Sequence, residues 1–239
     1  MDIFEQKLSA ITGGHVLDIA TSRGGFIGQL QENLASFETI IGIDVDAQIL
    51  ETSRSNFDDP AIGFLLMDAG QLGFANGRFD TLSASASLHH LPSIIQTLDE
   101  VMRVLKPGGT FVFAEMHRDA QTEAQHNIIQ LHHWAADVDT ARGVYHQKTY
   151  TRQELVSFLD QMDLHSVEMY DASDIDSDPM DEKAIQQCQD AIDKVLPRAI
   201  GLPEYKSLEA RAKILRQKIS TTGVQWEPIL FVIGQKPAY

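Results

Sequence analysis

The sequence has little cysteine, little basic charge and no long apolar run. Cys188 is the one cysteine, which excludes an internal disulfide and a thiolate zinc cluster. The 239 residues carry 19 Lys and Arg against 34 Asp and Glu, giving a net charge of −15. Such an acidic surface repels phosphate backbones and anionic membranes, so we expect neither a nucleic-acid partner nor a membrane partner. A neutral or cationic small molecule fits this charge better.

Targeting segments are also missing from the sequence. Residues 1–14 show no basic region followed by an apolar run, and no later stretch is long enough to span a bilayer. A cytoplasmic protein is therefore the default expectation. With 43% hydrophobic and 22% charged residues, the chain can bury a core, and its length suits a single domain over residues 1–239.

The first two-thirds of the chain alternates short apolar runs with helical patterns. The expected strands are His15–Ala20, Thr39–Asp44, Ile62–Met67, Thr81–Ser85 and Thr110–Glu115. Apolar residues at helical spacing fill Gly25–Asn33, Asp46–Asn56 and Ser93–Leu105. This alternation predicts the α/β class, with a Rossmann-like, mostly parallel sheet and helices on both faces.

Helices dominate the C-terminal half. Two further strands, His165–Tyr170 and Ile229–Gly234, bring the expected sheet to seven strands. Helical insertions are expected over 117–150 and 178–223, and Thr151 and Glu154 form a capping box at the start of another helix. The insertions could act as a lid over a ligand, or they could extend the core or form a homodimer surface.

Acidic residues end the first three expected strands. Asp18, Asp44 and Asp68 each stand at or just after such a strand, and carboxyl ends of parallel strands share one edge of a sheet. An acid after the second strand suits hydrogen bonds from both ribose hydroxyls. The alternative role is a helix N-cap, but Asp46 is the better cap and would leave Asp44 free.

Five segments in this order resemble the class I S-adenosylmethionine-dependent methyltransferases, and most of all their ubiquinone-biosynthesis-like, small-molecule branch. The segments are Val16–Phe26, Ile40–Asp46, Leu66–Leu72, Arg78–Leu91 and Arg103–Thr110. The most specific parts are the Leu-Lys-Pro-Gly-Gly turn at 105–109 and the Leu-His-His-Leu stretch at 88–91. The resemblance covers residues 15–116 and implies S-adenosylmethionine as cofactor and methyl transfer to a small-molecule acceptor.

The resemblance implies roles for matching residues. Asp18 would lie near the methionine amino group of the cofactor. Asp44 would hold the ribose, and Val45 would pack against the adenine. Asp68 would accept a hydrogen bond from the adenine amino group, with Ala69 supplying a backbone contact.

The turn after the first strand departs from the family pattern. Ala20 and Ser22 stand where glycines are usual, while Gly24 keeps the third glycine. These three residues would line the turn under the cofactor, and Ser85 would lie beside its methionine portion. The Ser22 hydroxyl could clash with the cofactor or donate a hydrogen bond to it.

Histidines near the ends of the fourth and fifth strands are the candidate catalytic residues. His89 and His90 follow the fourth strand, and Glu115 and His117 follow the fifth. A histidine at this edge could act as the general base for a hydroxyl or an acidic carbon. The alternative role for each is packing or helix capping.

A second histidine group raises the question of a metal. His126, His133 and Asp137 share one face of an expected helix, and His146 follows it. Imidazoles and a carboxylate suit a divalent ion, so these four residues are weak metal candidates. The same residues could line an acceptor pocket or form a polar face in solvent.

Two other classes of function compete with methyl transfer. A binding or regulatory protein could keep the cofactor pocket without turnover, and Ser22 in place of glycine motivates this alternative. A nicotinamide-dependent oxidoreductase is less favoured, because no Gly-x-Gly-x-x-Gly follows the first strand.

Overall fold

The computed structural model of the chain describes residues 3–239 and divides into two compact units. Unit 1 holds the chain up to Glu115 together with Val156–Tyr170 and Phe231–Tyr239, and unit 2 holds Met116–Leu155 and Asp171–Leu230. Both expected insertions, 117–150 and 178–223, fall within unit 2. Their use as a lid stays a prediction.

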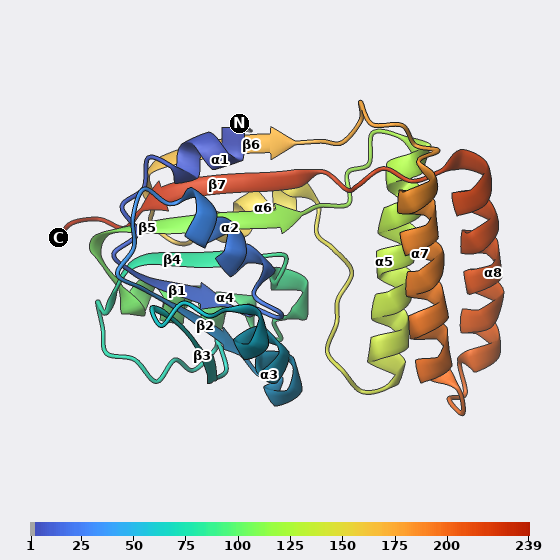
Figure 1. Ribbon diagram of the computed structural model, residues 1–239, viewed down its shortest axis with the longest axis horizontal. Helices are drawn as coiled ribbons and strands as arrows, with labels where there is room; N and C mark the ends of the chain where they lie inside the picture. Colours follow the sequence, from blue (N-terminus) through green and yellow to red (C-terminus); the bar gives the residue numbers. More distant parts are fainter. Residues whose placement is uncertain (1–2) are drawn as a thin grey trace. The chain divides into compact units, whose positions relative to one another are not determined.

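Unit 1 is built on the expected seven-stranded sheet. The strands are β1 (His15–Ile19), β2 (Thr39–Asp44), β3 (Ile62–Leu66), β4 (Phe79–Ser85), β5 (Leu105–Met116), β6 (His165–Ala172) and β7 (Ile229–Gln235). Their order is β3-β2-β1-β4-β5-β7-β6. The pairs β1–β2, β1–β4, β2–β3 and β4–β5 are parallel, while β7 runs opposite to β5 (Figure 1). The sequence-based prediction of a Rossmann-like, mostly parallel sheet is confirmed.

Helices cover both faces of this sheet. They are α1 (Ile3–Leu8), α2 (Gly25–Asn33), α3 (Ala47–Asn56), α4 (Ile94–Val104) and α6 (Arg152–Leu159), with a short 3₁₀ turn η1 (Leu88–His90). In Figure 1, α1, α2 and α3 lie in front of the sheet and α4 behind it. Leu8, Ile27, Leu30 and Leu50 from the front helices bury their side chains against Val16 and other strand residues. Burial of these apolar side chains holds the strand ends in place.

Two strands begin earlier than the sequence predicted. β4 begins at Phe79 instead of Thr81, and β5 begins at Leu105 instead of Thr110, because Phe79 pairs with Leu105 across a register shift. The turn residues also bond to the far end of the chain. Gly108 N–H donates to Lys236 O at 3.0 Å, and Lys236 N–H donates to Gly109 O at 2.9 Å. Pairing with a distant segment thus extends β5 through the Pro-Gly-Gly turn.

Unit 2 is a helical bundle with its own core. Its helices are α5 (Glu123–Ala141), α7 (Glu182–Val195) and α8 (Tyr205–Thr222), and the 3₁₀ turn η2 (Leu196–Ala199) lies between α7 and α8. The three long helices lie side by side in Figure 1. Trp134 is fully buried, and its indole N–H donates to Leu208 O at 2.9 Å. None of the helices within residues 3–239 is long and apolar enough to cross a bilayer.

Candidate functional site

Three carboxylates stand at or near the carboxyl ends of neighbouring strands. Asp18 lies in β1, Asp44 ends β2, and Asp68 follows β3 by two residues. The strand order places β2 between β1 and β3, and all three run parallel, so their carboxyl ends share one edge. We name the residues Asp18, Ser22, Asp44, Val45 and Asp68 the strand-tip site.

The turn after β1 uses backbone conformations that glycine normally supplies. Ala20, Ser22 and Gly24 have φ values of 50°, 49° and 81°. Such values are uncommon for residues that carry a Cβ. The expected turn is therefore formed even though alanine and serine replace two glycines. At Gly24 an added Cβ would come within 2.5 Å of Phe57 Cε2, so this position requires glycine.

Asp44 ties the turn to the end of β2. Its Oδ2 accepts the Ser22 N–H at 2.9 Å, and its Oδ1 accepts the Asp46 N–H at 3.0 Å. Asp46 caps α3 as predicted, since its side chain accepts the N–H groups of Gln48 and Ile49. Asp44 is therefore free of the capping role, as expected, although each of its oxygens accepts one backbone N–H. Each oxygen keeps a second acceptor position for a ligand.

Asp18 is a buried carboxylate with one oxygen unpartnered. Only 1% of the residue is exposed, and the Ser83 hydroxyl donates to its Oδ1 at 2.6 Å. Within the described chain, Oδ2 has no hydrogen-bond partner. Burial raises the pKa of Asp18 to about 6; the Ser83 and Thr21 hydroxyls oppose this rise, and the nearby Asp44 carboxylate adds to it. A buried polar atom without a partner costs about 1–3 kcal/mol, which the cationic group of a ligand would offset.

Apolar side chains are exposed beside these carboxylates. Val45 is 70% exposed after β2, and Leu66 is 59% exposed at the end of β3. Asp68 is exposed and accepts the Gly70 N–H at 2.8 Å, whereas Ala69 is buried. Exposed apolar residues beside a carboxylate suit a flat ring with a polar edge. The sequence did not indicate Leu66, because an apolar residue at a strand end is the pattern of a core residue.

Glu115, at the carboxyl end of β5, organises the segment after β4. Its Oε2 accepts the N–H groups of Ser87 and Leu88 at 2.8 and 2.9 Å. Its Oε1 lies 3.1 Å from His89 Nδ1, and both side chains are buried. His90 is exposed, and Ser85 ends β4 half-buried. No sequence motif indicates this arrangement, because the partners lie more than twenty positions away from Glu115.

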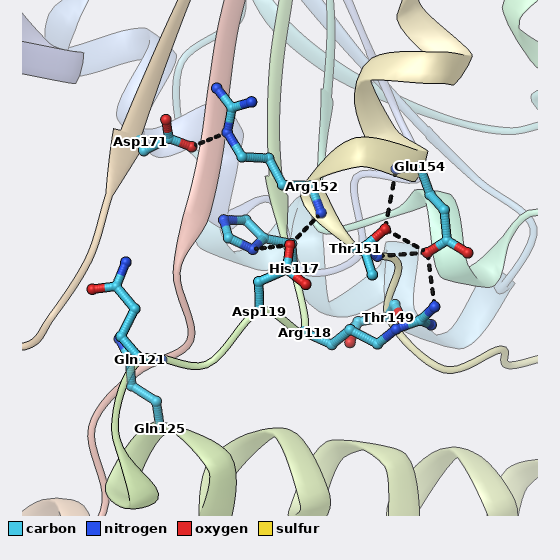
Figure 2. Close-up of polar contacts among 10 residues, drawn as sticks. All are labelled: His117, Arg118, Asp119, Gln121, Gln125, Thr149, Thr151, Arg152, Glu154 and Asp171. Carbon is cyan, nitrogen blue, oxygen red and sulfur yellow. Dashed lines mark hydrogen bonds and ion pairs between the residues drawn. The ribbon is translucent and has the colours of Figure 1, made fainter.

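His117, the third candidate base, belongs to unit 2. Its side chain is 5% exposed, and neither ring nitrogen has a hydrogen-bond partner within residues 3–239. Nδ1 lies 3.5 Å from Asp119 Oδ2, next to the ion pair of Arg152 and Asp171 (Figure 2). Burial lowers the pKa of His117, while the Asp119 and Asp171 carboxylates oppose this shift. The buried ring therefore favours its neutral form.

Figure 2 also shows the capping box at the start of α6. Thr151 N–H donates to Glu154 Oε2 at 2.7 Å, and Glu154 N–H donates to Thr151 Oγ1 at 3.1 Å, as the sequence predicted. Arg118 adds an ion pair to the same carboxylate at 2.8 Å.

The four weak metal candidates are not brought together. His133 Nε2 lies 2.9 Å from Thr149 Oγ1, and Asp137 pairs with Arg211 at 2.7 Å. His126 is exposed, and His146 instead contacts Asp139. No group of potential metal ligands among the described residues contains more than one of the four. Helical spacing correctly placed His126, His133 and Asp137 on α5. The side chains of His133 and Asp137, however, contact different partners.

Comparisons with known proteins find similarity to methyltransferases over part of the chain. Residues 17–113 match a family model described as a methyltransferase domain. The demethylmenaquinone methyltransferase of Lactococcus lactis is 31% identical over 113 residues, which are 46% of this chain and 45% of that protein. The chain spans about half the length of the curated relatives it matches.

Solved structures match over nearly the whole chain. The YcgJ protein of Bacillus subtilis aligns with a TM-score of 0.63 at 14% identity, covering 98% of this chain and 97% of that one. A phosphoethanolamine N-methyltransferase of Haemonchus contortus, solved with S-adenosyl-L-methionine, aligns with a TM-score of 0.59 at 16% identity, covering 97% and 51%. These likenesses show the fold. The match to the methyltransferase-domain model covers residues 17–113, which are less than half of the chain.

Proposed function

We propose that the chain transfers a methyl group from S-adenosylmethionine to a small-molecule acceptor. The observation that carries the proposal is the strand-tip site, where carboxylates end three adjacent parallel strands beside exposed apolar side chains. When bound, the cofactor supplies a methyl group already activated by its sulfonium. The protein then has to orient the acceptor, exclude water and handle a proton.

Residues of unit 1 fit the parts of the cofactor. The second acceptor positions of Asp44 suit two ribose hydroxyls, and the unpartnered oxygen of Asp18 suits the ammonium of the methionine part. Val45 offers an apolar surface to the adenine, with Asp68 and Ala69 at the polar edge of the ring. Ala20, Ser22 and Gly24 form the turn beneath it, and Ser85 stands at the end of β4 beside the methionine part.

His89 is the proposed proton acceptor for an acceptor molecule with an ionisable O–H or C–H group. A carboxylate that accepts the Nδ1 proton leaves Nε2 as the basic nitrogen, and Glu115 lies 3.1 Å from Nδ1. The N–H groups of Ser87 and Leu88 fix that carboxylate. His90 and His117 are the alternative bases, and substitution separates the three.

Measurements of cofactor binding and of turnover together test this function. Calorimetry with S-adenosylhomocysteine measures cofactor binding, and a methyl-release assay measures transfer to a panel of quinols, phenols and amines. Quinols come first because curated relatives are named for demethylmenaquinone. His89→Gln should lower kcat by about a hundredfold or more, whereas the exposed His126→Gln should leave kcat unchanged.

The outcomes separate the rival functions. Binding of S-adenosylhomocysteine without turnover on any acceptor would favour a regulatory cofactor-binding protein. A thermal shift with NADH and none with S-adenosylhomocysteine would overturn the assignment in favour of an oxidoreductase. If His89→Gln keeps the wild-type kcat and His90→Gln or His117→Gln instead loses about a hundredfold, the histidine whose substitution lowers kcat is the proton acceptor.

The turn residue Ser22 allows a separate prediction. Because its φ is 49°, Ser22→Gly should keep the affinity for S-adenosylhomocysteine within about threefold, whereas Ser22→Val should lower it by at least about tenfold. A β-branched residue resists positive φ and would withdraw the N–H that Asp44 accepts. Calorimetry on both variants measures the effect, and equal affinities would show that this turn does not support the cofactor.

A further inference from the structure

Two imidazole rings of unit 2 face each other. His132 Nε2 and His146 Nε2 lie 3.2 Å apart, and the ring planes are nearly perpendicular at 86°. His146 is buried, and His132 is half-buried. Both residues lie outside the family match over residues 17–113.

The end of α5 explains how the rings meet. Gly143 has a φ of 81°, and its N–H donates to Thr140 O at 2.9 Å. Val144 N–H donates to Asp139 O at 3.0 Å, which completes the glycine-ended turn that reverses a chain after a helix. The Thr140 hydroxyl then donates to His146 O at 3.1 Å, so this residue lies back against the last turns of the helix.

Asp139 fixes the orientation of one ring. Its Oδ2 lies 2.9 Å from His146 Nδ1, and its other oxygen pairs with Arg198. The hydrogen bond to this carboxylate occupies Nδ1 of His146, and the other ring nitrogen, Nε2, lies toward His132. Histidines that bind metals are commonly held by a carboxylate in this way.

The distance between the two nitrogens fits a shared metal ion. Zinc binds histidine nitrogen at about 2.0–2.1 Å, and a tetrahedral angle then separates two such nitrogens by roughly 3.3 Å. The rings stand 3.2 Å apart at these atoms. We propose that unit 2 binds a divalent transition-metal ion through Nε2 of His132 and His146, with Asp139 as the positioning residue. Two protein nitrogens leave at least two coordination positions for water or a further ligand.

A direct hydrogen bond between the two rings has nearly the same length, and a zinc titration separates the two cases. The full chain is stripped with EDTA, dialysed and titrated with Zn²⁺ by calorimetry in excess Mg²⁺, which occupies the many surface carboxylates. We expect one saturable site per chain, confirmed by elemental analysis after gel filtration. Absence of a saturable site would overturn the proposal.

Matched variants locate the site. His132→Gln and His146→Gln should each weaken Zn²⁺ binding by at least about tenfold, and Asp139→Asn should weaken it by about 10–100-fold. The control is His126→Gln, an exposed histidine on the same helix, which should bind as the wild type does. Wild-type affinity in the His132→Gln and His146→Gln double variant would refute the assignment.

A measurement on the wild-type chain guards against variants that fail to fold. Diethyl pyrocarbonate modifies accessible imidazole nitrogens, and mass spectrometry counts the modified histidines. Zn²⁺ should protect the half-buried His132 and leave the reaction of the exposed His126 unchanged. Equal modification of His132 with and without Zn²⁺ would contradict a shared ion.

Discussion

Replacing Asp44 with asparagine is expected to weaken the binding of S-adenosylhomocysteine by about a hundredfold, or roughly 2.7 kcal/mol. Both Asp44 oxygens hold a backbone N–H, and their remaining acceptor positions are the proposed partners of the ribose hydroxyls. Asparagine has one oxygen only, so its amide N–H₂ would point at the N–H of Ser22 or of Asp46. Hydrogen bonds to a charged group contribute about 1.5–3 kcal/mol each, which makes this loss large.

The control for Asp44→Asn is Asp46→Asn, the same substitution two residues later in the chain. Asp46 caps α3 through its side chain, and asparagine is an equally good N-cap. Asp46→Asn should therefore leave both the unfolding midpoint and the affinity nearly unchanged. Calorimetry on the two variants under one set of conditions makes the comparison. Similar affinities for Asp44→Asn and the wild type would remove the ribose role of Asp44 and with it the main support for the cofactor site.

The sequence predicted those parts of the fold that depend on neighbouring residues. Apolar runs located all seven strands, and β2 and α2 have the bounds expected from the sequence. The Asp46 cap and the Thr151 capping box are also local, since each is formed within three positions. The sequence predicts these caps because the geometry of a few consecutive residues fixes where the donor and the acceptor lie.

Features that join distant segments could not be read from the sequence. Ser83 donates to Asp18 from 65 positions away, and that contact decides which oxygen of Asp18 is left unpartnered. β5 is extended by Lys236, more than a hundred positions from Gly109. The facing pair of His132 and His146 is closer in sequence, but it depends on how the turn at Gly143 folds back. Helical spacing alone therefore does not indicate that His132 of α5 faces His146.

Asp18 should give unit 1 an unusual dependence of stability on pH. Its pKa is about 6 in the folded chain against 3.8 for the ordinary group, so between these values the folded state holds a proton that the unfolded state has lost. The contribution of Asp18 to the free energy of unfolding is therefore fully present below about pH 4, and it is lost as the pH rises through about 6. The difference between a pKa of 3.8 and a pKa of about 6 corresponds to a loss of roughly 3 kcal/mol of unfolding free energy.

Comparing the wild type with Asp18→Asn isolates this contribution. His117 has a lowered pKa and therefore an opposite effect, since stability from its neutral form is lost as the pH falls, but this effect is common to both proteins. Urea denaturation followed by far-UV circular dichroism at pH 4.5 and pH 7 measures the difference. Trp134 and Trp226 both lie in unit 2, so tryptophan fluorescence identifies the transition of that unit separately. Asp18→Asn should be more stable than the wild type at pH 7, and a variant of equal or lower stability would contradict the buried, unpaired carboxylate.

The same carboxylate should make cofactor binding depend on pH in the opposite direction. An ammonium group that pairs with Asp18 Oδ2 needs the ionised carboxylate, so affinity for S-adenosylhomocysteine should fall by roughly tenfold between pH 7 and pH 5. In Asp18→Asn the affinity should be lower at pH 7 and should change little over that range. Lowering the pH should thus stabilise ligand-free unit 1 and weaken its affinity for S-adenosylhomocysteine. A carboxylate that is only buried would affect the stability but not the affinity. If the affinity of the wild type stays constant down to pH 5, the ammonium of the ligand binds elsewhere.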